Sequence, residues 1–176
     1  MPQRKIRPIS GEDLYRFKLI SDVRISPDGE RIIYSLQRVE QKSEKKYSSL
    51  WLASSGRGAA RQFTWGDHND TAPRWSPNGE QIAFLSNRKD TEKPAQIYLI
   101  PTHGGEARPL SDIPGRIAEF AWSPDGKRLV CRVRKLDAEE LEQQDDEHKK
   151  ELGVVSRHYD RVFYKLDGDG YLPRQR

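Results

Sequence analysis

Ser26-Pro27-Asp28-Gly29 is the first of three copies of one tetrapeptide in this chain. It returns as Ser76-Pro77-Asn78-Gly79 and as Ser123-Pro124-Asp125-Gly126, at intervals of 50 and 47 residues. After two intervening residues, each copy is followed by a short apolar run, which begins at Ile32, Ile82 and Leu129. A period in the forties or fifties that is built of β-hairpins is typical of β-propellers. The sequence therefore predicts an all-β fold made of propeller blades.

The composition of the tetrapeptide suits a tight hairpin turn. Proline presets the backbone angle of the first central position, and Asp or Asn accepts the next position and can bond nearby amides. Glycine supplies the positive φ with which the chain leaves the turn. We therefore expect the repeat to have a structural role, as a hairpin turn, and no catalytic role.

The overall composition indicates a polar chain that can still form a core. Of its 176 residues, 34% are hydrophobic and 33% are charged. The apolar runs reach only four or five residues, against the roughly 20 that a membrane-spanning helix needs. No apolar stretch follows the basic segment Met1–Arg7, so we expect neither a secretory signal nor a membrane partner.

Charge and cysteine content exclude few partners but favour some classes over others. The formal charge of +4 comes from 31 basic and 27 acidic residues whose signs alternate along most of the chain. A nucleic-acid partner is not expected, because such partners require a concentrated basic face. The single cysteine, Cys131, lies in a strand-like run, where we expect a small buried hydrophobe. This usage is compatible with a cytoplasmic location.

Local patterns predict the order of the elements. A short helix is expected from Ser10, with Glu12 and Asp13 in its first turn and an end near Ser21-Asp22. The pattern then becomes β, and two repeats each read as a four-stranded antiparallel meander. The expected strands are 23–26, 31–36, 50–53 and 60–64, then 72–76, 80–86, 96–100 and 106–110, followed by 117–123 and 127–134.

These elements predict about two and a half blades. We assign residues 1–21 to an N-terminal arm and helix, 22–68 to blade 1, 69–115 to blade 2 and 116–176 to a partial blade 3. Within the last part, residues 137–152 are almost wholly charged or amide-bearing. They are expected to form a solvated helix or a disordered insertion.

The expected strands carry apolar side chains on both faces. Ile82 and Phe84 alternate with Ala83 and Leu85, so the sheet must be covered on both sides, as it is between neighbouring blades. Trp75 and Trp122 each precede the turn serine and suit the gap between splayed blades, whereas the first repeat has Ile25 at that position. This difference fits a terminal blade with a less crowded neighbour.

The segments around the turns resemble the N-terminal propeller of the prolyl oligopeptidase family of serine peptidases. The resemblance is strongest to its acylaminoacyl-peptidase and dipeptidyl-peptidase-like branch. It rests on Glu12-Asp13-Leu14, on Thr64 to Asp70 leading into Pro73-Arg74-Trp75-Ser76-Pro77, on Gly104-Gly105-Glu106-Ala107 and on Tyr159 to Tyr171. The resemblance implies a propeller that covers a hydrolase active site and restricts entry to short or N-acylated peptides.

The catalytic motif of that family is not found in this sequence. The family carries its nucleophile in a Gly-x-Ser-x-Gly elbow of an α/β-hydrolase domain. No serine here has a glycine two residues before it, so no catalytic residue is assigned. We expect a truncated fragment that is inactive alone, with the hydrolase domain of a parent protein and short peptides as its partners. Its open propeller edge is expected to favour self-association.

Several residues could suggest metal or acid–base chemistry, but each has a simpler interpretation. His68 and Asp70 could form a metal or acid–base pair, yet we expect them to satisfy backbone groups in a tight loop. Asp167-Gly168-Asp169-Gly170 resembles the start of a calcium loop but lacks its spaced ligands and closing glutamate. No metal and no cofactor is therefore expected. Simple surface or turn roles are expected for the remaining candidates, namely His103, His148, Arg132, Arg134 and Lys135.

A second function remains open at this point. Ser-Pro-Asp-Gly repeats also resemble those of TolB-like propellers, which suggests a non-enzymatic module for protein–protein interaction.

Overall fold

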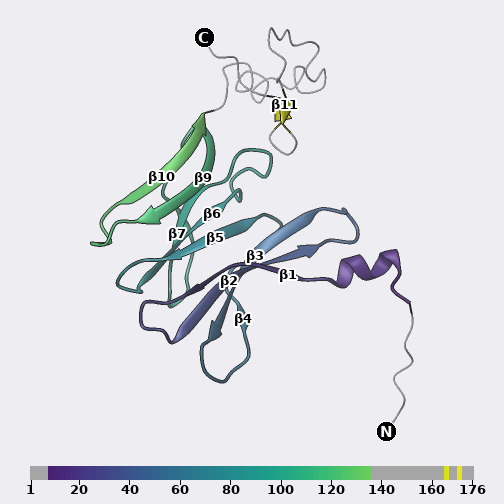
Figure 1. The fold of residues 1–176 in the computed structure, drawn as a ribbon, viewed down its shortest axis with the longest axis horizontal. Coiled ribbons are helices and arrows are strands. Elements are labelled where there is room, and N and C mark those ends of the chain that lie inside the picture. Colours follow the sequence, from purple (N-terminus) through teal and green to yellow (C-terminus); the bar gives the residue numbers. More distant parts are fainter. Residues whose placement is uncertain (1–7, 136–164, 167–169, 172–176) are drawn as a thin grey trace. The chain divides into compact units, whose positions relative to one another are not determined.

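The computed structural model describes residues 8–135, 165–166 and 170–171. The chain divides into two units, Met1–Arg134 and Lys135–Arg176. The first unit contains a short helix followed by antiparallel sheets, which confirms the all-β class and the blade-like meanders (Figure 1). In the second unit β11 (Lys165–Leu166) pairs with β12 (Gly170–Tyr171). The predicted charged insertion 137–152 lies outside the described residues.

Two four-stranded sheets follow the sequence order of the two complete repeats. The first is formed by β1 (Leu19–Ile25), β2 (Arg31–Val39), β3 (Lys46–Ser54) and β4 (Arg61–Gln62). The second is formed by β5 (Asp70–Trp75), β6 (Gln81–Ser86), β7 (Gln96–Pro101) and β8 (Arg108–Pro109). A third sheet pairs β9 (Gly115–Trp122) with β10 (Leu129–Lys135).

The predicted helix is present, but its predicted end is wrong. Gly11–Arg16 form a 3-10 helix, η1, whose start is closed by a capping box between Ser10 and Asp13. The chain then enters β1 at Leu19, because Leu19, Ile20 and Ser21 pair with the end of β2. Backbone N–H and C=O groups of these residues thus form hydrogen bonds with β2, so they are not available to extend the helix. The one helix of the described residues has six residues, too few to cross a bilayer.

The outer strands are shorter than predicted, and both repeats end them in the same way. Phe63 and Thr64 both donate their backbone N–H to the Leu50 carbonyl, at 2.8 and 3.2 Å, while the Leu50 N–H donates to Thr64 Oγ1 at 2.9 Å. In the second sheet Ile97 and Ser111 repeat the hydroxyl contact at 2.9 Å. In both sheets, the hydroxyl oxygen accepts the N–H that would otherwise bond to a backbone carbonyl of the outer strand. Each outer strand therefore ends after two residues.

The three tetrapeptide turns have one hydrogen-bond network. In each, the glycine N–H donates to the serine carbonyl at 2.9 Å, and the serine hydroxyl accepts the backbone N–H five residues later at 2.9 Å. The same hydroxyl donates to the side-chain oxygen of Asp28, Asn78 or Asp125. The glycines have φ angles of 77°, 71° and 68°, which side-chain-bearing residues adopt rarely. This confirms the structural interpretation of the repeat.

Consecutive sheets are joined by a tryptophan that reaches back to the preceding sheet. Trp75 Nε1 donates to the Arg24 carbonyl at 3.3 Å, and Trp122 Nε1 donates to the Arg74 carbonyl at 3.2 Å. Trp75 is 9% exposed and belongs to the core between the first two sheets. Both tryptophans therefore fill the gaps between sheets, as predicted, and each also supplies a directional bond that sets the register of one sheet on the next.

Neighbouring turns also touch each other in series. A Cβ atom on Gly79 would lie 3.8 Å from Cδ of Pro27, and one on Gly126 would lie 3.4 Å from Cδ of Pro77. Each turn thus rests against the proline of the turn before it. The tetrapeptide therefore determines both the conformation of each hairpin turn and the distance between successive turns.

An irregularity that the sequence did not predict recurs in the innermost strands. The register between β1 and β2 shifts after Ser21, and that between β5 and β6 shifts after Thr71. Asp22 and Ala72 lie at equivalent places in these bulges, with φ of 48° and 51°. Such bulges bend a strand and increase its twist. At the bulge in β1, the Asp22 carboxylate lies 2.9 Å from Nη1 of Arg74 in β5. This ion pair connects the first sheet to the second.

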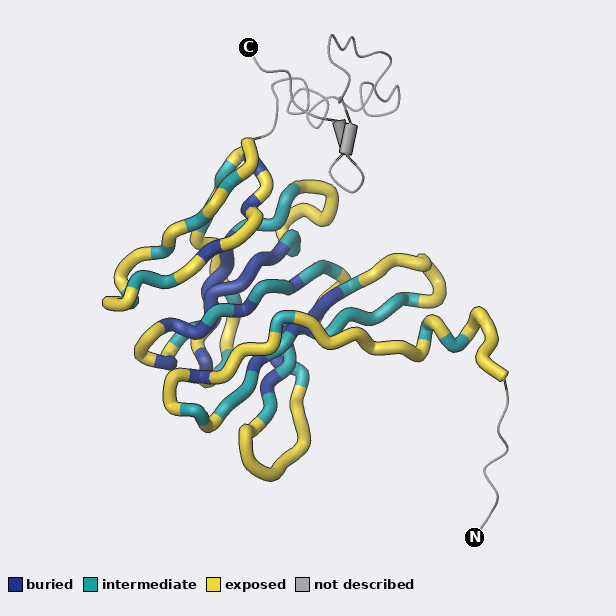
Figure 2. Tube along the Cα trace, viewed as in Figure 1, coloured by how far each residue is buried: buried dark blue, intermediate teal, exposed yellow. Residues whose placement is uncertain are grey.

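The second sheet is covered on both faces, as its alternating apolar residues predict. Ile82 and Phe84 pack in the core shared with the first sheet, while Ala83 and Leu85 pack in the core shared with the third. Cys131 was expected to be buried, but it is only half-buried at the rim of that second core. Figure 2 shows buried residues gathered in β3, β5, β6 and β7.

The first sheet has one covered and one uncovered face. Ile33 is buried toward the second sheet, so Ile32 and the residues paired in register with it face the opposite side. Ile25 pairs with Ile32 and is 62% exposed, although its equivalent in the second sheet is the buried Trp75. The strand β1 is exposed along nearly all its length (Figure 2).

We predict that removing the indole donor weakens the attachment between sheets. Trp122→Phe keeps an aromatic ring but leaves the Arg74 carbonyl without the Nε1 bond. The free energy of unfolding should fall by about 1–2 kcal/mol in urea titrations followed by circular dichroism. Trp65→Phe is the matched control, because Trp65 is 66% exposed and donates to no carbonyl in the described residues. Equal losses for both variants would contradict the role of the bond.

The turns also predict an acid-sensitive contribution to stability. The Ser26 hydroxyl and then the Glu30 N–H hold the pKa of Asp28 below its ordinary value of 3.8. Ser123 and Lys127 lower the pKa of Asp125 in the same way. A lowered pKa in the folded state means that this contribution is complete above about pH 4 and is lost as the pH falls further.

The second turn provides the natural control for this acid sensitivity, since Asn78 does not titrate. The double variant Asp28→Asn and Asp125→Asn should show a smaller decrease in the free energy of unfolding between about pH 5 and pH 2 than the parent chain. Urea titrations across that range measure the difference. Parallel pH profiles for the two proteins would refute the assignment.

The uncovered face of the first sheet predicts self-association of the isolated chain. Unpaired edges and apolar faces of this kind drive sheets together in water. Sedimentation velocity should show concentration-dependent association, and Ile20→Lys with Ile25→Lys should reduce it because both side chains lie on that face. Leu110→Lys, at an exposed apolar residue elsewhere, should have little effect. A monodisperse monomer in the parent chain would be evidence against this prediction.

Candidate functional site at the junction of the first two sheets

The chain passes from the first sheet to the second through residues 63–69. Gly66 has φ of 126°, and a Cβ atom there would lie only 2.2 Å from Cε1 of His68. Only glycine therefore lets the backbone fold against the imidazole ring. The Ser48 N–H donates to the His68 carbonyl at 3.3 Å, which ties this loop to β3.

Asp70 opens β5 and is fully buried, at 0% exposure. Arg88 Nη2 donates to Asp70 Oδ2 at 2.8 Å, and His68 Nε2 lies 3.4 Å from the same oxygen. The Ser35 hydroxyl of β2 donates to the Asp70 carbonyl at 2.9 Å. One residue thus connects the first strand of the second sheet to the first sheet and to Arg88.

Arg88 is held in place from several sides. Its guanidinium carbon lies 5.2 Å from the ring centre of Phe84 and 5.1 Å from that of Tyr98. Its Nε donates to Ser86 Oγ at 3.0 Å. Loss of Arg88 would leave the buried Asp70 carboxylate without a compensating charge. Leaving a buried charge unpaired in this way lowers the free energy of unfolding by about 3–5 kcal/mol. The cluster of His68, Asp70 and Arg88, hereafter the junction cluster, therefore acts as a structural anchor.

The junction cluster offers little for metal or acid–base chemistry. Zinc sites use three or four protein ligands, and no group of three His, Cys, Asp or Glu residues suited to a metal occurs in the described part of the chain. The nearby hydroxyls are already engaged, since Ser35 donates to a backbone carbonyl and Ser86 accepts from Arg88. What the arrangement can do is hold two sheets in register.

The expectation from sequence that His68 and Asp70 satisfy backbone groups does not describe their side chains, for which the structure shows no bond to a backbone group among the described residues. Their backbone carbonyls are bonded to the first sheet, whereas the Asp70 carboxylate pairs with Arg88. The hairpin register could have indicated this, because Asp70 pairs with Ser86 and Arg88 follows two residues later. Of the basic residues near a strand end, Arg132 pairs with Glu119 at 2.8 Å. His148 and residues 167–169 lie outside the described part.

Comparison with known families identifies the repeat architecture. The family model of the TolB beta propeller domain matches residues 18–161, which is most of the chain. This range includes all three turns and the junction cluster.

Two of the relatives of known sequence are peptidases of much greater length. The uncharacterized peptidase YuxL of Bacillus subtilis is 34% identical over 167 residues, which cover 92% of this chain and 24% of that protein. The dipeptidyl-peptidase 5 of Porphyromonas endodontalis is 29% identical over 119 residues, covering 68% of this chain and 17% of that protein. The chain thus spans about a quarter or less of these relatives.

A solved structure agrees at the level of the fold. The acylaminoacyl peptidase of Pyrococcus horikoshii superposes with a TM-score of 0.65 at 21% identity, covering 90% of this chain and 22% of that one. The three turns, the paired sheets and these comparisons lead to one conclusion: the chain belongs to the TolB beta propeller domain family and is a propeller segment related to those of peptidases.

Proposed function

We propose that this chain is the substrate-gating propeller segment of a serine peptidase of the prolyl oligopeptidase family that acts on short or N-acylated peptides. In this proposal the bond is cleaved in an α/β-hydrolase domain outside the chain, and the propeller contributes selection by size. The observation that carries the proposal is the relationship to a peptidase over 92% of the chain. The resemblance in the segments between the turns supports the choice of family.

The rigidity of the junctions between sheets is consistent with gating. A wall that rejects large substrates must resist opening between its sheets. Here each pair of neighbouring sheets shares a core and a tryptophan bond, and the first pair adds the hydrogen bond from the Ser35 hydroxyl to the buried Asp70 carbonyl. Directional bonds to buried groups are costly to break, which opposes separation of the sheets.

The strand directions define a loop-bearing end of the sheets, and in this proposal that end faces the hydrolase domain. β1 and β5 both run toward their tetrapeptide turns, so their first residues lie at the opposite end. Helix η1 and the loop 63–69 enter the strands at that end, and the loop carries the exposed Trp65. We place the hydrolase domain against this loop-bearing end.

A non-enzymatic interaction module is the second candidate. It is favoured by the match to the TolB family model and by the uncovered apolar face of the first sheet, which could receive another protein. The two functions differ in what accompanies the segment: a catalytic domain in one case and a binding partner in the other.

The test begins with the gene. We expect the reading frame beyond Arg176 to continue with more Ser-Pro-Asp-Gly turns and a later Gly-x-Ser-x-Gly elbow. The polypeptide so encoded should hydrolyse acylated or unblocked dipeptide anilides, and a serine-directed inhibitor should abolish the turnover. The 176-residue chain serves as the matched control and should show no turnover in the same assay.

Other outcomes would distinguish the alternatives. A frame without any hydrolase sequence would refute the peptidase proposal and leave the interaction module. Turnover by the 176-residue chain itself, sensitive to the same inhibitor, would show that catalysis does not need a second domain.

A further inference from the structure

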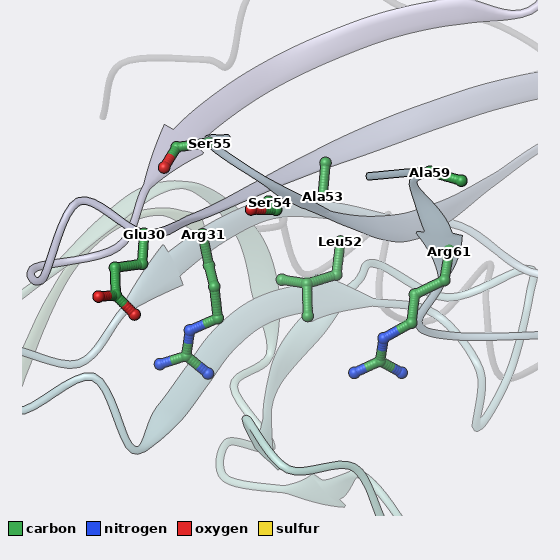
Figure 3. A pocket seen from close by; sticks show the side chains of 8 residues that line it. All are labelled: Glu30, Arg31, Leu52, Ala53, Ser54, Ser55, Ala59 and Arg61. Atoms are coloured by element: carbon green, nitrogen blue, oxygen red, sulfur yellow. The ribbon is translucent and has the colours of Figure 1, made fainter. Parts of the chain in front are cut away.

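A pocket of about 400 Å³ lies at the end of the first sheet that carries its tetrapeptide turn, hereafter the turn end. The junction cluster lies at the opposite end of the strands. The lining of the pocket comes from the start of β2, the end of β3 and the start of β4 (Figure 3). The residues that matter for its chemistry are Glu30, Arg31, Leu52, Ser54, Ala59 and Arg61. A volume of this size suits a small organic molecule.

The sheet register places two arginines on one side of the pocket. Arg61 pairs with Leu52, and Leu52 pairs with Ile33, which lies two residues after Arg31 on the same strand. All these side chains therefore project from the same face. Figure 3 shows Leu52 between the side chains of Arg31 and Arg61, which extend in the same direction. The pocket thus has an apolar wall flanked by two guanidinium groups.

Each guanidinium is positioned by an aromatic ring. That of Arg31 lies 5.0 Å from the ring centre of Trp75, and that of Arg61 lies 5.6 Å from the ring centre of Phe63. Stacked guanidinium groups keep a defined plane, so less conformational entropy is lost when they bind a ligand. The aromatic rings therefore prepare both arginines for an anion.

Most donors of the two arginines have no partner in the described part of the chain. Arg31 Nη2 donates to the Gly79 carbonyl at 3.4 Å and lies 3.6 Å from the Asp28 carboxylate. Arg61 makes no hydrogen bond or ion pair with any residue that the structure describes. A guanidinium carries five N–H donors. The pair can therefore offer several donors to a carboxylate placed between them.

We infer that this pocket binds a small organic carboxylate, with its charged group between Arg31 and Arg61 and its apolar part against Leu52 and Ala59. A carboxylate fits the planar fork of a guanidinium. A doubly charged phosphate is disfavoured, because Glu30 lines the pocket and Asp28 lies beside Arg31. Leu52 and Ala59 give an organic acid contacts that an inorganic anion cannot use. The inference is independent of the proposed peptidase function.

The probe for the test is N-acetylalanine, titrated into the 176-residue chain by isothermal titration calorimetry. N-acetylalaninamide, which has the same shape without the charge, and inorganic phosphate are the comparison ligands. We expect the carboxylate to bind, the amide not to bind and phosphate to bind more weakly than the carboxylate.

Three variants locate the site and separate it from a general charge effect. Arg61→Gln should weaken binding about tenfold or more. Arg57→Gln is the matched control, because it removes an equal charge from the same β3–β4 connection without lining the pocket, and it should leave the affinity unchanged. Glu30→Gln should tighten binding several-fold, a gain that a damaged fold cannot produce.

The inference is overturned if the chain shows no binding heat with N-acetylalanine. It is equally overturned if the amide binds as well as the acid, if phosphate binds more tightly, or if Arg57→Gln weakens binding as much as Arg61→Gln does.

Discussion

The first two sheets are apolar on both faces, and the rest of the structure depends on this constraint. A sheet of this kind cannot stand alone in water, because each face must be removed from solvent by another layer. The second sheet meets the requirement with a neighbour on either side, through the cores around Phe84 and around Leu85. The first sheet meets it on one face only, and its Ile25 side stays exposed. The stacking of successive sheets follows from this requirement.

Stacking by apolar contact alone would leave the sheets free to slide, and the chain prevents this with polar contacts. The indole N–H groups of Trp75 and Trp122 reach carbonyls of the preceding sheet, and the tetrapeptide turns rest on each other's prolines. At the other end of the strands, the Ser35 hydroxyl donates to the Asp70 carbonyl and the Ser48 N–H donates to the His68 carbonyl, which ties the first sheet to the start of the second. Hydrophobic burial thus supplies the attraction, while directional bonds choose one arrangement among many.

The two ends of the sheets have different chemistry, and this bears on function. The loop-bearing end carries the junction cluster, in which the buried Asp70 carboxylate is paired with the half-buried Arg88. The turn end carries the pocket in which the Arg61 donors have no partner among the residues that the structure describes. Charges committed to partners stabilise a junction, whereas uncommitted donors are available for a ligand. The same residue types therefore serve structure at one end and binding at the other.

Much of the local structure could be predicted from sequence because it depends on near neighbours. The turn needs only four residues, so three copies of it showed the hairpins, their spacing and the class of fold. The alternation around Ile82 showed that both faces of the sheet would be covered, and the position of Trp75 beside the turn suggested a filler between sheets. Helix η1 was the exception, since pairing of Leu19 with Gln37 on β2 ended it early.

Features that depend on residues far apart in the chain were decided only by the tertiary structure. The bulges at Asp22 and Ala72 carry no glycine to mark them, and they exist because the paired strands must bend together. Arg88 became the partner of Asp70, and Arg31 and Arg61 came to flank Leu52 on one face of the sheet, because strand register placed them there. The sequence alone determined a repeated hairpin and its two-faced sheets. Which charged groups meet is set by long-range pairing, and local sequence does not encode it.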